Sequence, residues 1–130
     1  MKILLVDDEP DFVEVTQTLL ESHDFDVVTA YSGAEAREKA PEEQPDLIIL
    51  DVMMETQTEG FDVARWLRER EDTQGIPIIM LTAVNQEVPW RFEPDEIWLP
   101  VDTFLDKPVS PERLLAEVQK AVKHIEAEEE

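Results

Sequence analysis

The most constraining stretch of this sequence is a short aliphatic run that ends in a carboxylate. Leu47 to Leu50 are four consecutive aliphatic residues without polar alternation, and Asp51 follows them directly. Such a run is typical of a strand buried on both faces of a parallel sheet. A carboxylate inside the run would carry a large desolvation cost, so we expect Asp51 at the strand's carboxyl end. Open α/β sheets place their ligand crevice at this end, which makes Asp51 the first candidate for chemistry.

Strand-like and helix-like segments alternate along the whole chain. The apolar runs predict five strands, at residues 2–6, 26–30, 46–51, 76–81 and 103–105. Helical periodicity and end signals predict four helices, at residues 10–22, 34–40, 61–71 and from 111 onwards. Pro41 is expected to end the second helix, and Ser110 to cap the last one. At most a short helix, at residues 94–99, fits the proline-rich stretch 83–100. This alternation predicts a parallel sheet with helices on both faces.

Composition limits the class of protein. With 130 residues and 42% hydrophobic content, the chain is long enough for one domain with a core, expected at residues 1–125, before an acidic tail at 126–130. The net charge of −21 disfavours binding to nucleic acid or to an anionic membrane surface. Zero cysteines exclude disulfides and thiolate chemistry, and no apolar run is long enough to cross a bilayer. We therefore expect a soluble, cytoplasmic protein.

Polar side chains follow the predicted strands at one common edge. Asp7 and Asp8 follow the first strand, Asp51 the third, Thr82 the fourth and Lys107 the fifth. Three clustered carboxylates repel one another unless a cation lies among them, and oxygen ligands suit Mg²⁺. A carboxylate nucleophile, a metal, a lysine and a hydroxyl are the groups needed to form and stabilise an aspartyl phosphate.

These residues resemble the receiver domain of bacterial two-component response regulators. The resemblance spans essentially the whole chain and implies a flavodoxin-like sheet of receiver type with strand order 2-1-3-4-5. It rests on Val6-Asp7-Asp8-Glu9, Asp51-Val52-Met53-Met54 with Gly60 downstream, Leu81-Thr82-Ala83 and Phe104-Leu105-Asp106-Lys107-Pro108.

The resemblance implies a role for each residue at the metal and phosphoacceptor site. Asp51 would accept a phosphoryl group from a histidine kinase. Asp8 would ligate Mg²⁺ directly, and Asp7 would do so directly or through water. The backbone carbonyl of Met53 would be the remaining ligand that the protein supplies to the ion.

The resemblance also implies a switch. Lys107 would pair with the phosphoryl group, and Thr82 would hydrogen-bond to it. Phe104 would turn inward as Thr82 moves. The output surface would be formed by the fourth helix, which is the short one at residues 94–99, the fifth strand, and the fifth helix, which begins at residue 111.

The partners would be a sensor histidine kinase or phosphotransfer protein and an unidentified downstream protein, with a phosphorylation-dependent homodimer as a further option. The chain would assist its own phosphorylation and dephosphorylation and turn over no separate substrate. It is expected to be either a stand-alone regulator or an excised domain.

Three positions depart from the family pattern. Glu55 stands where a proline usually follows the methionine, and the loop to Gly60 is one residue longer. Pro100-Val101 replaces a common Gly-Ala pair, and the segment 83–100 is a few residues long and rich in proline. These changes affect the approach of the kinase and the usual output face.

Three alternatives remain open. A Mg²⁺-dependent aspartyl phosphohydrolase needs a second acid two residues after its nucleophile, where this chain has Met53. A flavodoxin-like cofactor binder needs a Ser/Thr/Gly-rich loop after the first strand, where Asp7 and Asp8 would repel a phosphate. A phosphorylation-independent interaction module with a receiver fold is the third. Within the receiver interpretation, Met53 and Val84 would flank the phosphoryl group, and neither can orient an attacking water. A long-lived phosphoaspartate is therefore expected.

Overall fold

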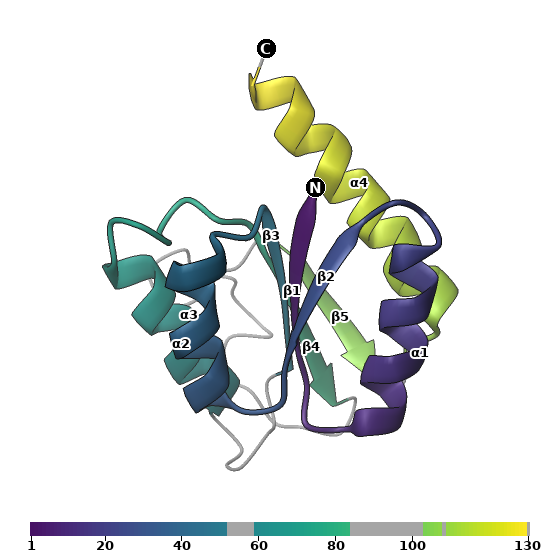
Figure 1. Ribbon diagram of the computed structural model, residues 1–130, viewed down its shortest axis with the longest axis horizontal. Coiled ribbons are helices and arrows are strands. Elements are labelled where there is room, and N and C mark those ends of the chain that lie inside the picture. Colours follow the sequence, from purple (N-terminus) through teal and green to yellow (C-terminus); the bar gives the residue numbers. More distant parts are fainter. Residues whose placement is uncertain (52–58, 84–102, 108, 130) are drawn as a thin grey trace.

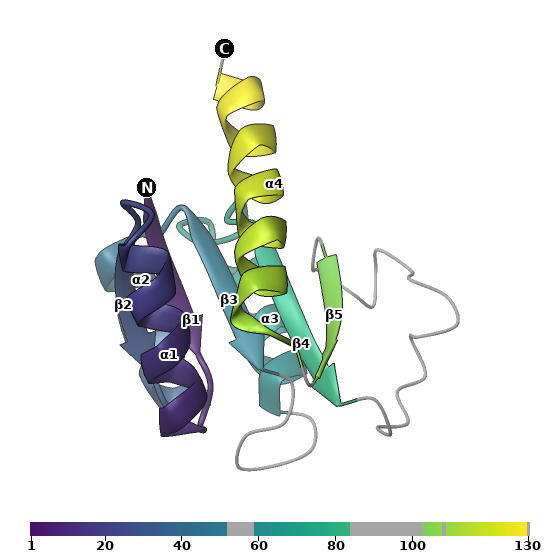
Figure 2. The ribbon, with the colours of Figure 1, turned by 90° about the vertical axis from the view of Figure 1, so that its right-hand side faces the viewer.

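The apolar runs form one parallel sheet in the computed structural model. The structure describes residues 1–51, 59–83, 103–107 and 109–129. Five strands lie in the order β2-β1-β3-β4-β5 (Figure 2), and all neighbouring pairs are parallel. They are β1 (Lys2–Val6), β2 (Asp26–Ala30), β3 (Leu47–Asp51), β4 (Ile78–Ala83) and β5 (Thr103–Lys107). The predicted flavodoxin-like fold and its strand order are confirmed.

Four described helices cover the two faces of the sheet. On one side lie α1 (Pro10–Glu21) and α4 (Pro111–Glu129), and on the other α2 (Gly33–Glu43) and α3 (Glu59–Glu69) (Figure 1). The helix labelled α4 is the one expected to follow the fifth strand. The short helix expected at 94–99 lies outside the described residues. None of the described helices is both long and apolar enough to cross a membrane.

The central strand is buried on both faces, as its sequence predicts. Alternate residues of β3 enter two separate cores. Leu47 and Ile49 pack with residues of α1 and α4, whereas Ile48 and Leu50 pack with residues of α2 and α3. All four are fully buried, and burying each such side chain contributes roughly 1.5–3 kcal/mol. The two cores therefore fix β3 and the position of Asp51 at its end.

Helix α2 ends three residues later than the sequence predicts. Pro41 does not terminate this helix, which continues to Glu43. Pro41 costs the helix one hydrogen bond because it lacks an N–H donor, but the last bond of the ladder is present, since Gln44 N–H donates to Ala40 O at 3.0 Å. The helix ends instead at Gln44, whose backbone is left-handed with φ 48° and ψ 59°. The connection predicted at 41–45 shortens accordingly.

Replacing Gln44 with glycine should stabilise the protein. The left-handed conformation strains a residue with a Cβ atom, and glycine removes that strain at some cost in unfolded-chain entropy. We expect Gln44→Gly to raise the free energy of unfolding by about 0.5–1 kcal/mol, measured by urea denaturation. Gln44→Ala is the control, because it also loses the 3.1 Å hydrogen bond to Pro41 O but keeps the strain. Equal stabilities of the two variants would contradict this account.

The connection between α3 and β4 is held by arginines. Arg68 donates to the carbonyls of Gln74 and Ile76, at 3.0 and 2.6 Å. The Arg70 guanidinium lies 4.8 Å from the centre of the Trp66 ring. It also donates to Asp72, which lowers the pKa of that carboxyl. These contacts fix the chain where it enters the sheet.

The boundaries around this connection differ from the sequence predictions by two residues. Helix α3 covers 59–69 rather than 61–71, and β4 covers 78–83 rather than 76–81. Pro77 precedes β4, where only its carbonyl joins the pairing by accepting the Ile48 N–H at 3.0 Å. The later end of β4 brings Thr82 inside the strand.

The last helix begins as predicted. The Ser110 hydroxyl accepts the Arg113 N–H at 3.1 Å, which is the expected cap. Figure 2 shows the carboxyl-terminal part of α4 extending past the end of the sheet. The helix continues to Glu129, so residues 126–129 of the expected tail are helical. The division between domain and tail at residue 125 stays a prediction.

A lysine side chain from α2 covers one backbone carbonyl on the open side of the edge strand β2. The Lys39 ammonium, from α2, donates to Thr29 O and lies 3.5 Å from the Glu35 carboxylate. A backbone carbonyl at the border of the sheet is thereby satisfied.

Candidate functional site

Asp7 is the most enclosed member of the site. It follows β1 directly, and none of its surface is exposed. Its N–H donates to Ala30 O at 3.1 Å, and its Oδ1 accepts the Glu9 N–H at 2.9 Å. The first bond ties Asp7 to the end of β2, and the second forms a tight turn at the start of α1. The carboxylate is therefore held in one orientation.

Asp51 is presented by the rigid centre of the sheet. It is the last residue of β3, pairs with Leu81 of β4 and is only 3% exposed. The neighbouring β1 ends in register with β3, because Val6 pairs with Leu50. The residues that follow Val6 and Leu50 therefore meet at one edge.

Asp8 completes a three-carboxylate cluster. One ligand oxygen from each of Asp7, Asp8 and Asp51 lies within 4.8 Å of the other two. Asp8 is exposed whereas the other two are buried, so the cluster has one side toward solvent. The donor set consists of carboxylate oxygens, which suits a hard divalent cation such as Mg²⁺. The predicted convergence of these three carboxylates is observed.

The other predicted site residues are placed by their backbones. Thr82 follows the partner of Asp51 in β4 and pairs with Asp106, while Lys107 pairs with Ala83. Thr82 thus lies near the end of the strand beside β3, and Lys107 lies at the end of the next strand beyond it. Phe104 pairs with Met80, two residues further inside the sheet. The side chains of Thr82, Phe104 and Lys107, and Met53 as a whole, lie outside the described part, so their roles stay predictions.

Sequence reasoning missed the backbone groups that orient Asp7. The Glu9 N–H is one of them, and the Ala30 carbonyl is the other. A local signal for the first existed, since aspartate side chains often accept the N–H two residues ahead. The second requires the pairing of β1 with β2, which no local pattern encodes.

The chain belongs to the response regulator receiver domain family. It matches the family's sequence model, described as "Response regulator receiver domain", over residues 3–119. It is 39% identical over 128 residues to the alkaline phosphatase synthesis transcriptional regulatory protein PhoP of Bacillus subtilis (strain 168), covering 96% of this chain and 50% of that protein. It is 38% identical over 117 residues to the transcriptional regulatory protein GltR of Pseudomonas aeruginosa, covering 90% of this chain and 47% of that protein.

Solved structures agree with this assignment. Chemotaxis protein CheY4 of Vibrio cholerae superposes with a TM-score of 0.78 at 31% identity, over 92% of this chain and 96% of that one. The response regulator 1452 receiver domain of Francisella gives a TM-score of 0.79 at 25% identity, over 95% and 97% of the two chains. The chain spans about half the length of the curated relatives it matches.

Family membership confirms the function class predicted from the sequence. The chain is a receiver domain of two-component response regulators, which supports phosphorylation-dependent signalling. Receiver domains of response regulators are signalling proteins that interact with histidine kinases or phosphotransfer proteins.

The carboxylate cluster should destabilise the protein when no divalent cation is present. Two unit charges 4.8 Å apart repel by roughly 3 kcal/mol at an effective dielectric constant of about 20. Removing the Asp51 charge should therefore raise stability. In EDTA we expect Asp51→Asn to unfold at a higher temperature than the wild type by an amount equivalent to about 1–3 kcal/mol. Added Mg²⁺ should stabilise the wild type more than the variant.

Asp62→Asn is the matched control for this measurement. Asp62 is exposed on α3, and in the described structure its carboxylate has no hydrogen-bond or ion-pair partner. This variant should keep the wild-type response to Mg²⁺. If Asp51→Asn were no more stable than the wild type in EDTA, the proposed repulsion would be wrong.

Proposed function

We propose that Asp51 is the phosphoacceptor of this receiver and that Asp7 and Asp8 hold the Mg²⁺ needed for the transfer. The observation that carries the proposal is the convergence of these three carboxylates within 4.8 Å at the carboxyl edge of the sheet. The burial of Asp51 at the end of a strand packed on both faces keeps it in place for attack. Family membership supplies the reaction class.

The transfer itself is a simple displacement. A carboxylate oxygen of Asp51 attacks the phosphorus of a phosphohistidine, the new O–P bond forms, and the P–N bond breaks. The departing imidazole takes up a proton. When bound, Mg²⁺ would offset the negative charge on the transferred group. The buried Asp7, held by the Glu9 N–H, would keep one oxygen oriented toward the cation, and the exposed Asp8 would complete the ligand set from the solvent side.

The proposed switch uses the adjacent strand ends. Phosphorylation adds about −1.5 to −2 charge at neutral pH, which attracts a hydroxyl and an ammonium group. The backbone positions of Thr82 and Lys107, at the ends of β4 and β5, are consistent with that role. In this proposal Phe104 follows Thr82, and the Met53 carbonyl joins the metal site. The surface formed by the short helix expected at residues 94–99, β5 and α4 carries the signal.

The surrounding assignments belong to the same proposal. A sensor histidine kinase or phosphotransfer protein would supply the phosphoryl group in the cytoplasm, and an unidentified protein would receive the signal. The net charge of −21 disfavours direct binding of nucleic acid by this domain. The phosphohydrolase and the phosphorylation-independent module remain the competing functions.

Acetyl phosphate separates these functions. Incubation with Mg²⁺ should add the mass of one phosphoryl group to the wild type and to Asp62→Asn, but not to Asp51→Asn, and EDTA should prevent the addition. Intact-mass spectrometry is the measurement. Release of many phosphate equivalents per chain would identify a phosphohydrolase. An unmodified wild type would leave the interaction module as the better interpretation.

The lifetime of the adduct tests the residues next to it. Met53 and Val84 are apolar and cannot orient a water for attack, so we expect slow loss of the phosphoryl group without a phosphatase. Met53→Asn should speed that loss, because an amide can hold a water. Val84→Ile is the apolar control and should leave the lifetime unchanged. Rapid loss from the wild type would contradict the expectation.

A further inference from the structure

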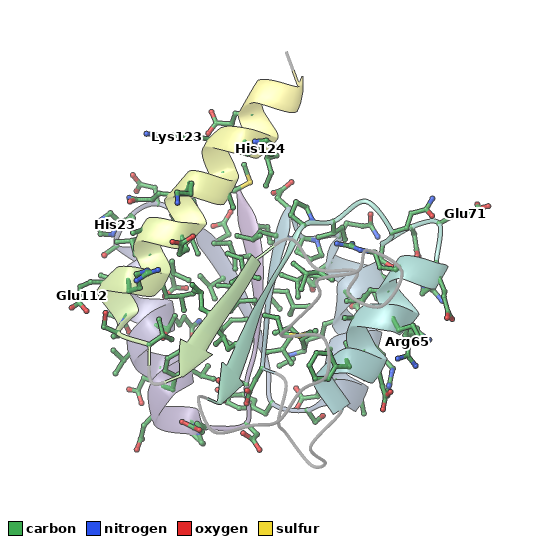
Figure 3. All side chains as sticks on the ribbon, turned by 180° about the vertical axis from the view of Figure 1, so that it is seen from behind. His23, Arg65, Glu71, Glu112, Lys123 and His124 are labelled. Carbon is green, nitrogen blue, oxygen red and sulfur yellow. The ribbon has the colours of Figure 1, made fainter. Side chains whose placement is uncertain are left out.

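The surface of this receiver carries far more acid than its cations can neutralise. The chain has 32 Asp and Glu residues against 11 Lys and Arg residues. Acidic side chains lie on opposite sides of the molecule, where Glu71 beyond α3 and Glu112 at the start of α4 point outward (Figure 3). An excess of this size makes the compact state repel itself.

Helix α2 shows the repulsion at the level of single residues. Glu38 and Glu42 are both exposed, lie one turn apart, and have no hydrogen-bond or ion-pair partner in the described structure. Like charges at this spacing destabilise a helix. Lys39 of the same helix is already engaged by Glu35 and by Thr29 O. The outer face of α2 therefore keeps two uncompensated carboxylates.

Negative charge is also left uncompensated at the carboxyl ends of the helices. Of the four described helices, α1, α2 and α4 have no basic residue in the last turn, although the negative end of the helix dipole favours one. In α4 the last turn contains Glu128 and Glu129 instead. The carboxyl ends of these three helices therefore lack the cationic side chain that the helix dipole favours.

Glu117, unlike Glu38 and Glu42, has cationic side chains beside its carboxylate. Glu117 on α4 lies 3.6 Å from the Arg113 guanidinium and 3.9 Å from the Lys120 ammonium. It is also mostly buried, with its side chain 15% exposed. Removing its charge would lose two attractive contacts, whereas removing that of Glu38 or Glu42 would lose none.

We propose that the fold of this protein is adapted to concentrated salt and depends on cations that screen its surface carboxylates. The Debye length falls from about 30 Å at 0.01 M to about 3 Å at 1 M salt. At low ionic strength the acids therefore repel one another across the whole domain, and at molar salt only between immediate neighbours. The sheet has two fully buried apolar cores, whereas the outer face of α2 and the carboxyl ends of α1, α2 and α4 lack compensating cations. Strong screening reconciles these two features.

Thermal unfolding against salt tests the proposal without any phosphoryl chemistry. Melting temperatures would be measured in EDTA at KCl concentrations from about 0.02 M to about 2 M. We expect a rise of several degrees, with the steepest part at the low end. Sucrose at matched osmolality controls for solute exclusion, which stabilises proteins without screening. Asp51→Asn should show a similar rise, because most of the repulsion lies outside the carboxylate cluster.

Two variants with matched chemistry locate the effect. The double variant Glu38→Gln/Glu42→Gln should melt above the wild type at about 0.02 M KCl and no differently at about 2 M. Glu117→Gln should show no gain at low salt, because it loses the contacts with Arg113 and Lys120.

Three results would overturn the proposal: a wild-type melting temperature independent of KCl, a rise fully reproduced by sucrose, or an equal gain of the double variant at both salt concentrations. A rise confined to the wild type and absent from Asp51→Asn would also overturn it, because it would assign the effect to the carboxylate cluster alone. None of these results bears on whether Asp51 accepts a phosphoryl group.

Discussion

The cost of burying a charge determines where the chemistry of this protein can lie. Leu47 to Leu50 are sealed between two cores, so the strand cannot admit a carboxylate before its end. Asp51 stands where the apolar environment stops, and the parallel register with β1 brings Asp7 and Asp8 to the same level. The cores that stabilise the sheet thereby also assemble the acids, although mutual repulsion of those acids works against folding.

Two scales of electrostatics act on the same molecule. At the sheet edge, three carboxylates are concentrated within 4.8 Å, a local repulsion that one divalent cation can offset. Over the rest of the surface the excess acid is diffuse, and only mobile ions can reduce its effect. The local site and the global surface therefore respond to different ions, which is why chelation and ionic strength separate them in solution.

The sequence predicted those features that depend on local pattern and desolvation. Strands at 2–6 and 26–30 and the Ser110 cap were found from apolar runs and capping chemistry alone, and the acid cluster followed from parallel topology. The end of α2 differs from the prediction, because Pro41 does not stop the helix, which ends only where Gln44 adopts a left-handed conformation. The hydrogen bond between Asp7 and Ala30 has no local signal, because the resemblance implies that β2 lies beside β1 but not the register that brings Ala30 O to the Asp7 N–H. The side chains of Thr82, Phe104 and Lys107 stay at the level of prediction.

The contact of Lys39 with Thr29 O has a consequence for how copies of this protein meet. An edge strand with free carbonyls is a template on which another extended chain can add, the first step of aggregation by strand addition. Here an ammonium group occupies one of those acceptors on β2. A second chain would have to displace a charged side chain before it could pair at that carbonyl, which disfavours strand addition at this point of the sheet border.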